Sequence, residues 1–327
     1  MTLEKRPLFV HIISHGPHCL DGVAAAVAVT RARAGAVVRP WFVTNKDVND
    51  AVQQLTCAPA DAEHEVWITD VSWTDHAADR HLWALADRGV RIHWVDHHRT
   101  AIERYRAGDV DVPFATCIVS EKFAASRLVY EHLRTEIDST GVSNPRFDDL
   151  WPVIERADDT DRWIHEVPGS HELALAVRAM GCVDSYYDLL EIDRDVTYTP
   201  RMQAASERVQ AELQRSYDTA ARERFSVRLP TGLTLVTTIC QGYASEVADS
   251  FGKTTPNAVF AIYDSQCLAV SLRRTPDCKV DLSRLARNFG GGGHPAAAGC
   301  ELPWLKSDIP RRLAGILAPL LTRHIPS

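Results

Sequence analysis

Short apolar runs alternate with longer helical patterns through the first half of the chain. The run Leu8–Ile13 predicts a buried strand, and Gly22–Ala34 predicts the helix that follows it. The same alternation predicts three more strands and one more helix, at residues 37–43, 65–70, 90–95 and 73–87. Strands that alternate with helices in this way form a parallel, doubly wound α/β sheet. Ligands bind such sheets beyond the carboxyl ends of the strands.

The second half of the chain has a different pattern. The segment Pro200–Arg224 is long, charged and rich in Ala, Gln, Glu and Arg, which predicts a connecting helix. Beyond it, four β-type runs and a short helix are expected at residues 225–229, 233–240, 258–263, 267–272 and 282–288. We therefore predict a larger α/β domain over residues 1–195, a helical linker over 196–224 and a smaller α+β domain over 225–327.

Composition narrows the classes of partner. The 327 residues carry a formal net charge of −7, so the chain lacks the basic surface that binding to long nucleic acid requires. A local phosphate site is compatible with this charge, because bound divalent metals offset clustered carboxylates. The eight cysteines form no CxxC pair, so we expect no structural zinc site. Met1–Arg6 lacks the apolar core of a signal peptide and no stretch is long enough to span a membrane, so a cytoplasmic location is expected.

Polar side chains gather where predicted strands end. The apolar run that starts near Ile92 closes on Asp96, His97 and His98. Polar groups at a buried strand end are tolerated when they are paired, hydrogen-bonded or bound to a cation. Because adjacent strand residues point in opposite directions, one imidazole can bind a metal while the other faces a substrate. Asp70 ends another apolar run, although a carboxylate there can also cap the next helix.

A third strand end precedes the sequence His15, His18, Cys19 and Asp21, followed by Gly22. Imidazole and carboxylate together suit divalent ions such as manganese, whereas carboxylate alone suits magnesium. Gly22 is expected to let the backbone turn tightly into the helix. The alternative is that Asp21 merely caps the amino end of that helix.

An acidic cluster formed by Asp158, Asp159 and Asp161 lies on or near a predicted helix, between two tryptophans. Clustered acids are usually solvated, but the tryptophans favour partial burial beside a cation. One of these acids would complete a set of ligands large enough for two ions that share a carboxylate, together with His15, Asp21, Asp70 and His97.

The second domain contributes a glycine run and two arginines. Backbone approaches a phosphate closely where no Cβ intervenes, as at Gly291, Gly292 and Gly293 before His294. A simple flexible loop is the alternative, but the flanking helix and the alanines that follow favour tight packing. Arginines suited to bidentate phosphate contacts end a nearby predicted strand: Arg273 and Arg274.

Two of these motifs resemble the signatures of the DHH phosphoesterase family with its C-terminal DHHA1 domain. Asp96-His97-His98 resembles the motif that names the family, and Gly291–Gly299 resembles the glycine-rich signature of the second domain. The resemblance spans nearly the whole chain. It implies a metal-binding catalytic DHH domain over residues 1–195 and a DHHA1 substrate-binding domain over 225–327, with the active site in the cleft between them. It also implies a manganese- or magnesium-dependent hydrolase, since the family includes oligoribonucleases, exonucleases, nucleotide phosphatases and polyphosphate hydrolases.

The resemblance also implies a role for individual residues. The implied metal ligands are His15, Asp21, Asp70, His97 and Asp159. Asp70 would bridge two ions, and Asp159 is preferred as the last ligand over Asp158 and Asp161. The implied catalytic residues are His98, Asp70 and Arg273. The substrate phosphate or terminal nucleotide is implied to contact His98, Arg273, Gly291, Gly292, Gly293 and His294.

One position departs from the commoner family motif, in which an aspartate stands where this chain has Cys19. The sequence resembles a variant branch in which this cysteine is followed by Asp21 and Gly22. Loss of the carboxylate would weaken one metal site, shift its preference towards softer ions or transfer coordination to His18. Cys19 as a metal ligand and Cys19 as a buried bystander thiol both stay open.

We expect a phosphoesterase that hydrolyses phosphodiester or phosphomonoester bonds of short oligonucleotides or small nucleotides, using water activated by two Mn²⁺ or Mg²⁺ ions. One alternative is a hydrolase of polyphosphate or pyrophosphate. Another is a nucleotide-binding regulatory module with weakened activity. The expected partner is the short substrate, without long duplexes or membranes, and a homodimer is left open.

Overall fold

The computed structural model describes residues 6–59 and 61–323. The chain forms two compact units that divide after Val209, within helix α10 (Pro200–Arg222). The predicted domain limits, at residues 195 and 225, flank this helix. Within the described ranges no helix is long and apolar enough to cross a membrane. The expectation that the chain has no leader rested on Met1–Arg6, of which all but the last residue lie outside the described ranges.

The first unit is built on a five-stranded sheet in which all paired strands are parallel. Its strands are β1 (Leu8–His15), β2 (Val37–Val43), β3 (Glu63–Thr69), β4 (Arg91–Asp96) and β5 (Thr116–Val119). Their order is β2-β1-β3-β4-β5, a doubly wound arrangement whose switch point lies between β1 and β3. The predicted fold class of this domain is therefore confirmed.

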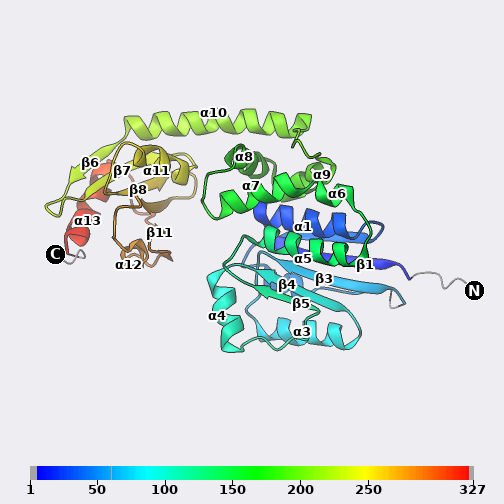
Figure 1. Cartoon of the computed structure of the whole chain (residues 1–327). Coiled ribbons are helices and arrows are strands. Elements are labelled where there is room, and N and C mark those ends of the chain that lie inside the picture. Colours follow the sequence, from blue (N-terminus) through cyan, green and yellow to red (C-terminus); the bar gives the residue numbers. More distant parts are fainter. Residues whose placement is uncertain (1–5, 60, 324–327) are drawn as a thin grey trace, which may run out of the picture. The chain divides into compact units, whose positions relative to one another are not determined.

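Helices cover both faces of this sheet (Figure 1). On one face α1 (Leu20–Ala32) and α5 (Ala125–Thr140) pack against the strands. Four more helices pack over these two and over one another: α6 (Pro145–Asp148), α7 (Trp151–Asp161), α8 (Ser170–Met180) and α9 (Cys182–Glu191). The other face carries α2 (Val48–Gln53), α3 (His76–Asp87) and α4 (Arg99–Ala107). Successive side chains of a strand point to opposite faces, so Ile12 packs in the first of these cores and Ile13 in the second.

Helix α1 is buried along nearly its whole length because small Ala and Val side chains fill it. They let the helix lie close to the sheet and to α5, α7 and α9. The helix predicted over residues 73–87 begins later, at His76. The side chain of Asp75 caps it by accepting a hydrogen bond from the backbone N–H of Ala77.

The second unit contains a six-stranded mixed sheet in the order β10-β11-β9-β8-β7-β6. Its strands are β6 (Phe225–Arg228), β7 (Thr234–Cys240), β8 (Ala258–Asp264), β9 (Ala269–Arg274), β10 (Gly292–Gly293) and β11 (Ala297–Glu301). Strands β7 and β8 are parallel, and the other paired strands are antiparallel. Its remaining helices are α11 (Ala244–Gly252), α12 (Leu282–Arg287) and α13 (Ile309–Arg323). The predicted α+β class of this domain is confirmed.

The glycine run packs directly against β11. A Cβ at Gly291 would lie 2.1 Å from the carbonyl oxygen of Gly299, and one at Gly293 would lie 2.6 Å from that of Ala297. Gly293 also has a φ of 133°, which side chains disfavour, whereas Gly292 has open space around it. Close backbone packing therefore explains two of the glycines, in agreement with the predicted tight packing. Contact of this run with a phosphate stays a prediction.

Candidate metal centre

Three strands of the first unit bring polar side chains to the carboxyl edge of the parallel sheet. His15 is the last residue of β1, and Asp96 is the last residue of β4. Asp70 directly follows β3 and has a φ of 59°, a left-handed conformation that aspartate adopts more readily than most residues. Such strained positions cluster at functional sites, so this edge is a candidate site on backbone grounds as well.

Two helices bring further acids to this edge. Asp21 is buried in the first turn of α1, and a Cβ on its neighbour Gly22 would lie 2.2 Å from the carbonyl oxygen of His15. Gly22 is thus required by the close approach of α1 to β1, and not by the tight turn that we predicted, because its backbone is helical. Asp161 is the last residue of α7, where the negative end of the helix dipole disfavours a carboxylate. A nearby cation would remove this penalty.

The two carboxylate oxygens of Asp70 face different groups. Oδ2 accepts a hydrogen bond from the Cys19 thiol at 3.2 Å and lies 3.5 Å from Nδ1 of His15. Oδ1 lies 3.3 Å from Nε2 of His97 and 3.8 Å from Nδ1 of His98. Asp70 is therefore shared by two groups of metal-binding side chains, which is how a carboxylate lies when it bridges two ions.

His97 is surrounded by carboxylates. Besides Asp70, its Nε2 lies 3.3 Å from Oδ2 of Asp161 and 3.8 Å from Oδ2 of Asp21. Burial lowers the pKa of His97, but these carboxylates outweigh it and raise the pKa to about 10. Burial, Asp70 and Asp161 together raise the pKa of Asp21 well above its usual value. The cluster formed by Asp21, Asp70, His97 and Asp161 thus carries a surplus of negative charge. A divalent cation would balance this charge more fully than a single proton.

The chemistry of the cluster fits a metal ion. His97 Nε2 and Asp70 Oδ1 are buried and face each other at 3.3 Å as an ion pair, but neither makes a hydrogen bond of good geometry within the described ranges. Buried polar atoms are stabilised by a well-placed partner, which a bound cation would supply to both. Imidazole nitrogen and carboxylate oxygen are ligands of manganese and related divalent ions. The residues present therefore fit the metal that the sequence led us to expect.

Asp96 orients His98. Its Oδ1 accepts hydrogen bonds from the backbone N–H of His98 at 2.9 Å and from Nδ1 of the same residue at 2.8 Å. Its Oδ2 accepts a hydrogen bond from the hydroxyl of Ser72. Asp96 is fully buried, whereas the side chain of His98 is 43% exposed. The imidazole of His98 is therefore fixed in orientation by Asp96 and accessible to solvent beside the cluster. This position is compatible with its predicted substrate-facing role.

Asp159 is the acid of α7 that the sequence favours as the last metal ligand, but in the structure Asp161 is the acid of this helix that lies beside His97. Asp159 is buried, and its Oδ1 accepts hydrogen bonds from the backbone N–H groups of Glu166 and Val167. Its Oδ2 accepts one from the hydroxyl of Ser170. These bonds hold the loop that follows α7 and engage both carboxylate oxygens of Asp159.

Asp158 is also occupied elsewhere. It accepts hydrogen bonds from the backbone N–H of Ala124 and from the guanidinium of Arg127, near the start of α5. The acids at 158, 159 and 161 share a single helical turn. Their sequence pattern therefore gave no signal for which of them faces the cluster, and only the packing of α7 separates them.

Asp21 does not cap its own helix. Cys19 is the N-cap residue of α1, and its sulfur accepts a hydrogen bond from the backbone N–H of Gly22. Asp21 instead accepts hydrogen bonds from the backbone N–H groups of Ala125 and Ser126, at the start of α5. The alternative reading of Asp21 as a cap of α1 is therefore wrong.

Cys19 forms a group with His15 and Asp70, and the ligand atoms of these three residues are all within 4.8 Å of one another. His18 is not a member of this group. Nδ1 of the exposed His18 donates a hydrogen bond to the carbonyl oxygen of Arg178 at 2.9 Å. Burial and the neighbouring Asp70 raise the pKa of the Cys19 thiol well above its usual value. Without a cation the thiol therefore stays protonated and donates to Asp70.

Comparison with known proteins identifies relatives of this chain. The family model described as the DHHA1 domain matches residues 233–316. Oligoribonuclease NrnB of Bacillus subtilis (strain 168) is 25% identical to this chain over 309 residues, which are 89% of this chain and 72% of that protein. The chain belongs to the DHH/DHHA1 phosphoesterase family.

Solved structures share the fold of this DHH/DHHA1 protein. One is the pGpG-specific phosphodiesterase PggH from Vibrio, with a TM-score of 0.60 and 13% identity over 97% of this chain and 99% of that chain. Another is RecJ of Thermus thermophilus in complex with Mn²⁺, with a TM-score of 0.53 and 14% identity over 98% of this chain and 52% of that chain. At these identities the likeness shows the fold alone.

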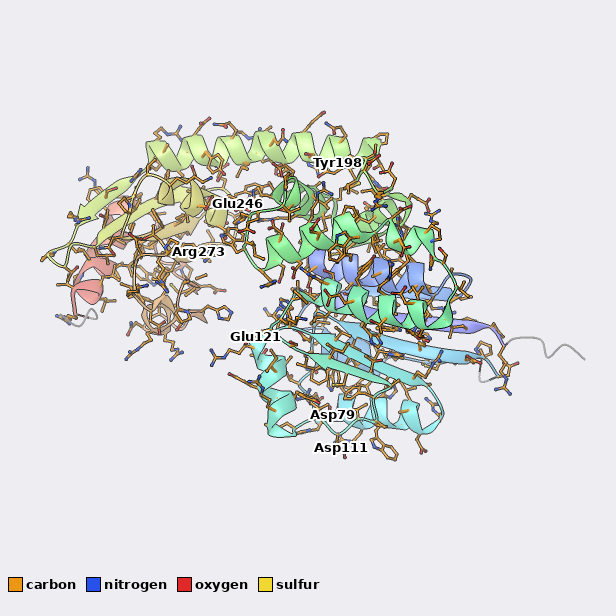
Figure 2. All side chains as sticks on the ribbon, in the orientation of Figure 1. Asp79, Asp111, Glu121, Tyr198, Glu246 and Arg273 are labelled. Atoms are coloured by element: carbon orange, nitrogen blue, oxygen red, sulfur yellow. The ribbon has the colours of Figure 1, made fainter. Side chains whose placement is uncertain are left out.

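The predicted substrate-binding residues of the DHHA1 domain lie in the second unit. Figure 2 labels one of them, Arg273. Arg273, on β9, donates hydrogen bonds to the hydroxyl of Ser245 at 2.8 Å and to the carbonyl oxygen of Leu272 at 2.9 Å. Burial lowers its pKa, while the nearby Glu246 acts in the opposite direction. His294 is exposed. Their roles in substrate binding, and the cleft between the two domains, stay predictions.

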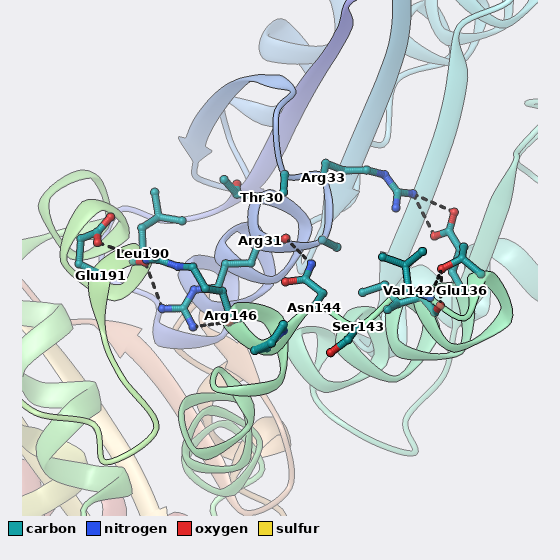
Figure 3. Close-up of a pocket in the computed structure, with 15 residues that line it drawn as sticks. Thr30, Arg31, Arg33, Glu136, Val142, Ser143, Asn144, Arg146, Leu190 and Glu191 are labelled. Atoms are coloured by element: carbon teal, nitrogen blue, oxygen red, sulfur yellow. Dashed lines mark hydrogen bonds and ion pairs between the residues drawn. The ribbon is translucent and has the colours of Figure 1, made fainter. Parts of the chain in front are cut away.

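A cavity of about 860 Å³ lies in the DHH domain beside the ends of α1 and α5 (Figure 3). It is lined by none of the predicted site residues. Arg31 donates to the carbonyl oxygen of Ile192 at 2.6 Å, and Arg33 pairs with Glu136 at 3.0 Å. Arg146, also in the lining, donates to the carbonyl oxygen of Leu190 at 2.7 Å and pairs with Glu191 at 3.2 Å. Because all three guanidinium groups are already engaged by the protein, this cavity offers an anion little attraction.

Proposed function

We propose that this DHH/DHHA1 phosphoesterase hydrolyses phosphodiester or phosphomonoester bonds of short oligonucleotides or small nucleotides, with two divalent ions, Mn²⁺ or Mg²⁺. The observation that carries the proposal is the position of Asp70. Its Oδ2 faces His15 and Cys19, and its Oδ1 faces His97. One buried carboxylate shared by two ligand groups supports a two-metal centre over a single ion.

The proposal gives each side chain a task. One ion would be held by His15, Cys19 and Asp70, and the other by Asp70, His97, Asp21 and Asp161. Bound ions of this kind activate water and neutralise charge on the phosphoryl oxygens. Asp21 is held by two backbone N–H groups of α5, so its position is fixed independently of the ions. Because Asp21 is already in place, less conformational entropy is lost when ions and substrate bind.

His98 is proposed to donate a hydrogen bond to a phosphoryl oxygen. Burial lowers its pKa, but the hydrogen bond to Asp96 outweighs this effect and raises the pKa above its usual value. Nδ1 is bound to Asp96, so protonation places the second N–H on Nε2. A donor held in place by a buried carboxylate stabilises developing negative charge without reorganisation.

A short substrate is supported by charge and by the relatives. The net charge of −7 disfavours long nucleic acid. Among the relatives, one is described as an oligoribonuclease and one as a pGpG-specific phosphodiesterase.

A substrate panel with manganese tests the proposal. Purified protein is assayed with a linear dinucleotide, a cyclic dinucleotide, adenosine bisphosphate and polyphosphate, and mononucleotide and phosphate release are measured. We expect the highest kcat/KM with the linear dinucleotide or the bisphosphate, and no turnover after chelation. Faster turnover of polyphosphate would overturn the substrate class. Tight nucleotide binding without turnover, with one ion bound, would favour the regulatory alternative.

Asp96→Asn is expected to lower kcat about 10–100-fold with the best substrate of this panel. The amide removes the charge that holds and protonates His98, but it removes no proposed metal ligand. Manganese stoichiometry, measured by titration calorimetry on the same preparation, should stay at the wild-type value. Asp87→Asn, at the exposed end of α3, is the matched control. If Asp96→Asn lost bound manganese instead, a positioning role for Asp96 would be excluded.

A further inference from the structure

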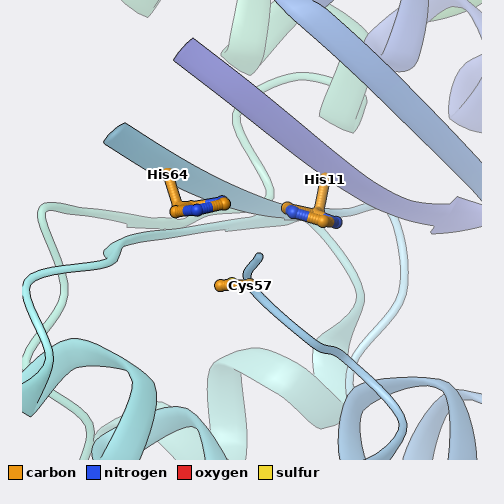
Figure 4. Close-up of side chains that lie close together, drawn as sticks. All are labelled: His11, Cys57 and His64. Atoms are coloured by element: carbon orange, nitrogen blue, oxygen red, sulfur yellow. The ribbon is translucent and has the colours of Figure 1, made fainter. Parts of the chain in front are cut away.

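A second group of metal-binding side chains lies in the DHH domain, formed by His11, Cys57 and His64 (Figure 4). His11 is on β1, His64 is on β3, and Cys57 lies in the loop between α2 and β3. Each residue offers a ligand atom, and these atoms all lie within 4.8 Å of one another. A search for CxxC pairs does not find such a group, because its members are separated in sequence and meet only through the pairing of β1 with β3.

Both imidazoles have a nitrogen without a partner. His11 and His64 are 4% and 7% exposed, and His11 Nε2 and His64 Nδ1 are buried with no hydrogen-bond partner within the described ranges. Nε2 of His64 lies 2.9 Å from the carbonyl oxygen of Pro59, which fixes the orientation of that ring. The rings stack with their centroids 5.8 Å apart. A satisfied pair of core histidines would not leave two buried nitrogens unpaired.

The donor set differs from that of the candidate metal centre. Two imidazoles and one thiol, with no carboxylate, suit a borderline-soft ion such as zinc better than manganese or magnesium. Burial lowers the pKa of His11 to about 4, so its ring is neutral at physiological pH, as a ligand must be. His11 and His15 are four residues apart on β1, which is about 13 Å at the usual rise of a strand. The group therefore lies nearer the amino ends of the strands than the candidate metal centre does.

We propose that His11, His64 and Cys57 bind a zinc ion, with water in the fourth position. Two nitrogens and one sulfur around a tetrahedral zinc ion lie about 3.3–3.6 Å apart, so a group whose atoms are within 4.8 Å of one another contracts by at most about 1.5 Å. Cys57 is half-buried in a loop, which allows this movement. The thiol releases its proton to solvent as the zinc–sulfur bond forms. The ion would tie the loop after α2 to β1 and β3, and this does not depend on the proposed function.

Cobalt(II) absorption tests the site. Cobalt bound by a thiolate gives a charge-transfer band that nitrogen and oxygen ligands do not give. Titrations use the full chain with Cys19→Ser, which removes the thiol of the other metal centre. We expect one equivalent of cobalt to produce the band and zinc to displace it. The band should be lost when Cys57→Ser or His64→Gln is added, with unchanged far-ultraviolet circular dichroism.

Cys117→Ser is the matched control, since Cys117 is another half-buried cysteine outside the group, and it should leave the band unchanged. Absence of the band in the Cys19→Ser protein would overturn the proposal. So would a band of equal intensity after Cys57→Ser. If Cys19→Ser does not fold, the zinc content of the otherwise unmodified chain decides: Cys57→Ser must lower it by one equivalent.

Discussion

Replacement of Asp70 by asparagine is expected to lower kcat for the best nucleotide substrate by at least about 10³-fold, equivalent to about 4 kcal/mol of transition-state stabilisation. Asp70 is the carboxylate whose two oxygens face the two ligand groups. An amide keeps the shape but loses the charge and replaces one oxygen with a nitrogen that does not bind the ion. Both proposed metal sites should therefore weaken together.

Asparagine is the suitable substitution at this position. Asp70 has a φ of 59°, and asparagine adopts this conformation at least as readily as aspartate, whereas alanine would add backbone strain. Activity is measured as mononucleotide release with saturating manganese, and ion binding is measured by calorimetry. Asp87→Asn serves again as the surface control. Wild-type kcat in Asp70→Asn would refute the two-metal proposal.

The second large effect should separate Asp161 from Asp159. Asp161→Ala is expected to lower kcat about 10²-fold or more and to weaken manganese binding, because its Oδ2 is one of the oxygens facing His97. It should leave stability unchanged or increase it slightly. The substitution removes a carboxylate from the carboxyl end of α7 and from a cluster of like charges.

Asp159→Ala is expected to give the opposite result. Three donors lose their acceptor, and one of them is the hydroxyl of the buried Ser170, which should lower the free energy of unfolding by about 1–3 kcal/mol. Among molecules that remain folded, kcat and manganese affinity should stay near the wild-type values. Urea unfolding and kinetics on both variants check this. A loss of manganese binding in Asp159→Ala, with Asp161→Ala active, would restore the sequence-based choice.

The sequence alone determined the fold class and the location of the candidate metal centre. Apolar runs that alternate with helical patterns specify a parallel sheet, since only a layered arrangement buries both. Parallel strands present their carboxyl ends at one edge, so polar residues that follow separate strands had to meet there. His15, Asp70 and His97 do lie together at this edge.

Tertiary structure alone decided which neighbouring atoms face one another. Periodicity separates the faces of a helix, but it could not rank Asp159 against Asp161. The difference came from backbone N–H groups of the following loop, which claim the carboxylate of Asp159. In the same way, the start of α5 holds Asp21, and strand pairing brings His11 beside His64. Such contacts join residues far apart in sequence, and they depend on distances of a few ångströms that a one-dimensional pattern does not contain.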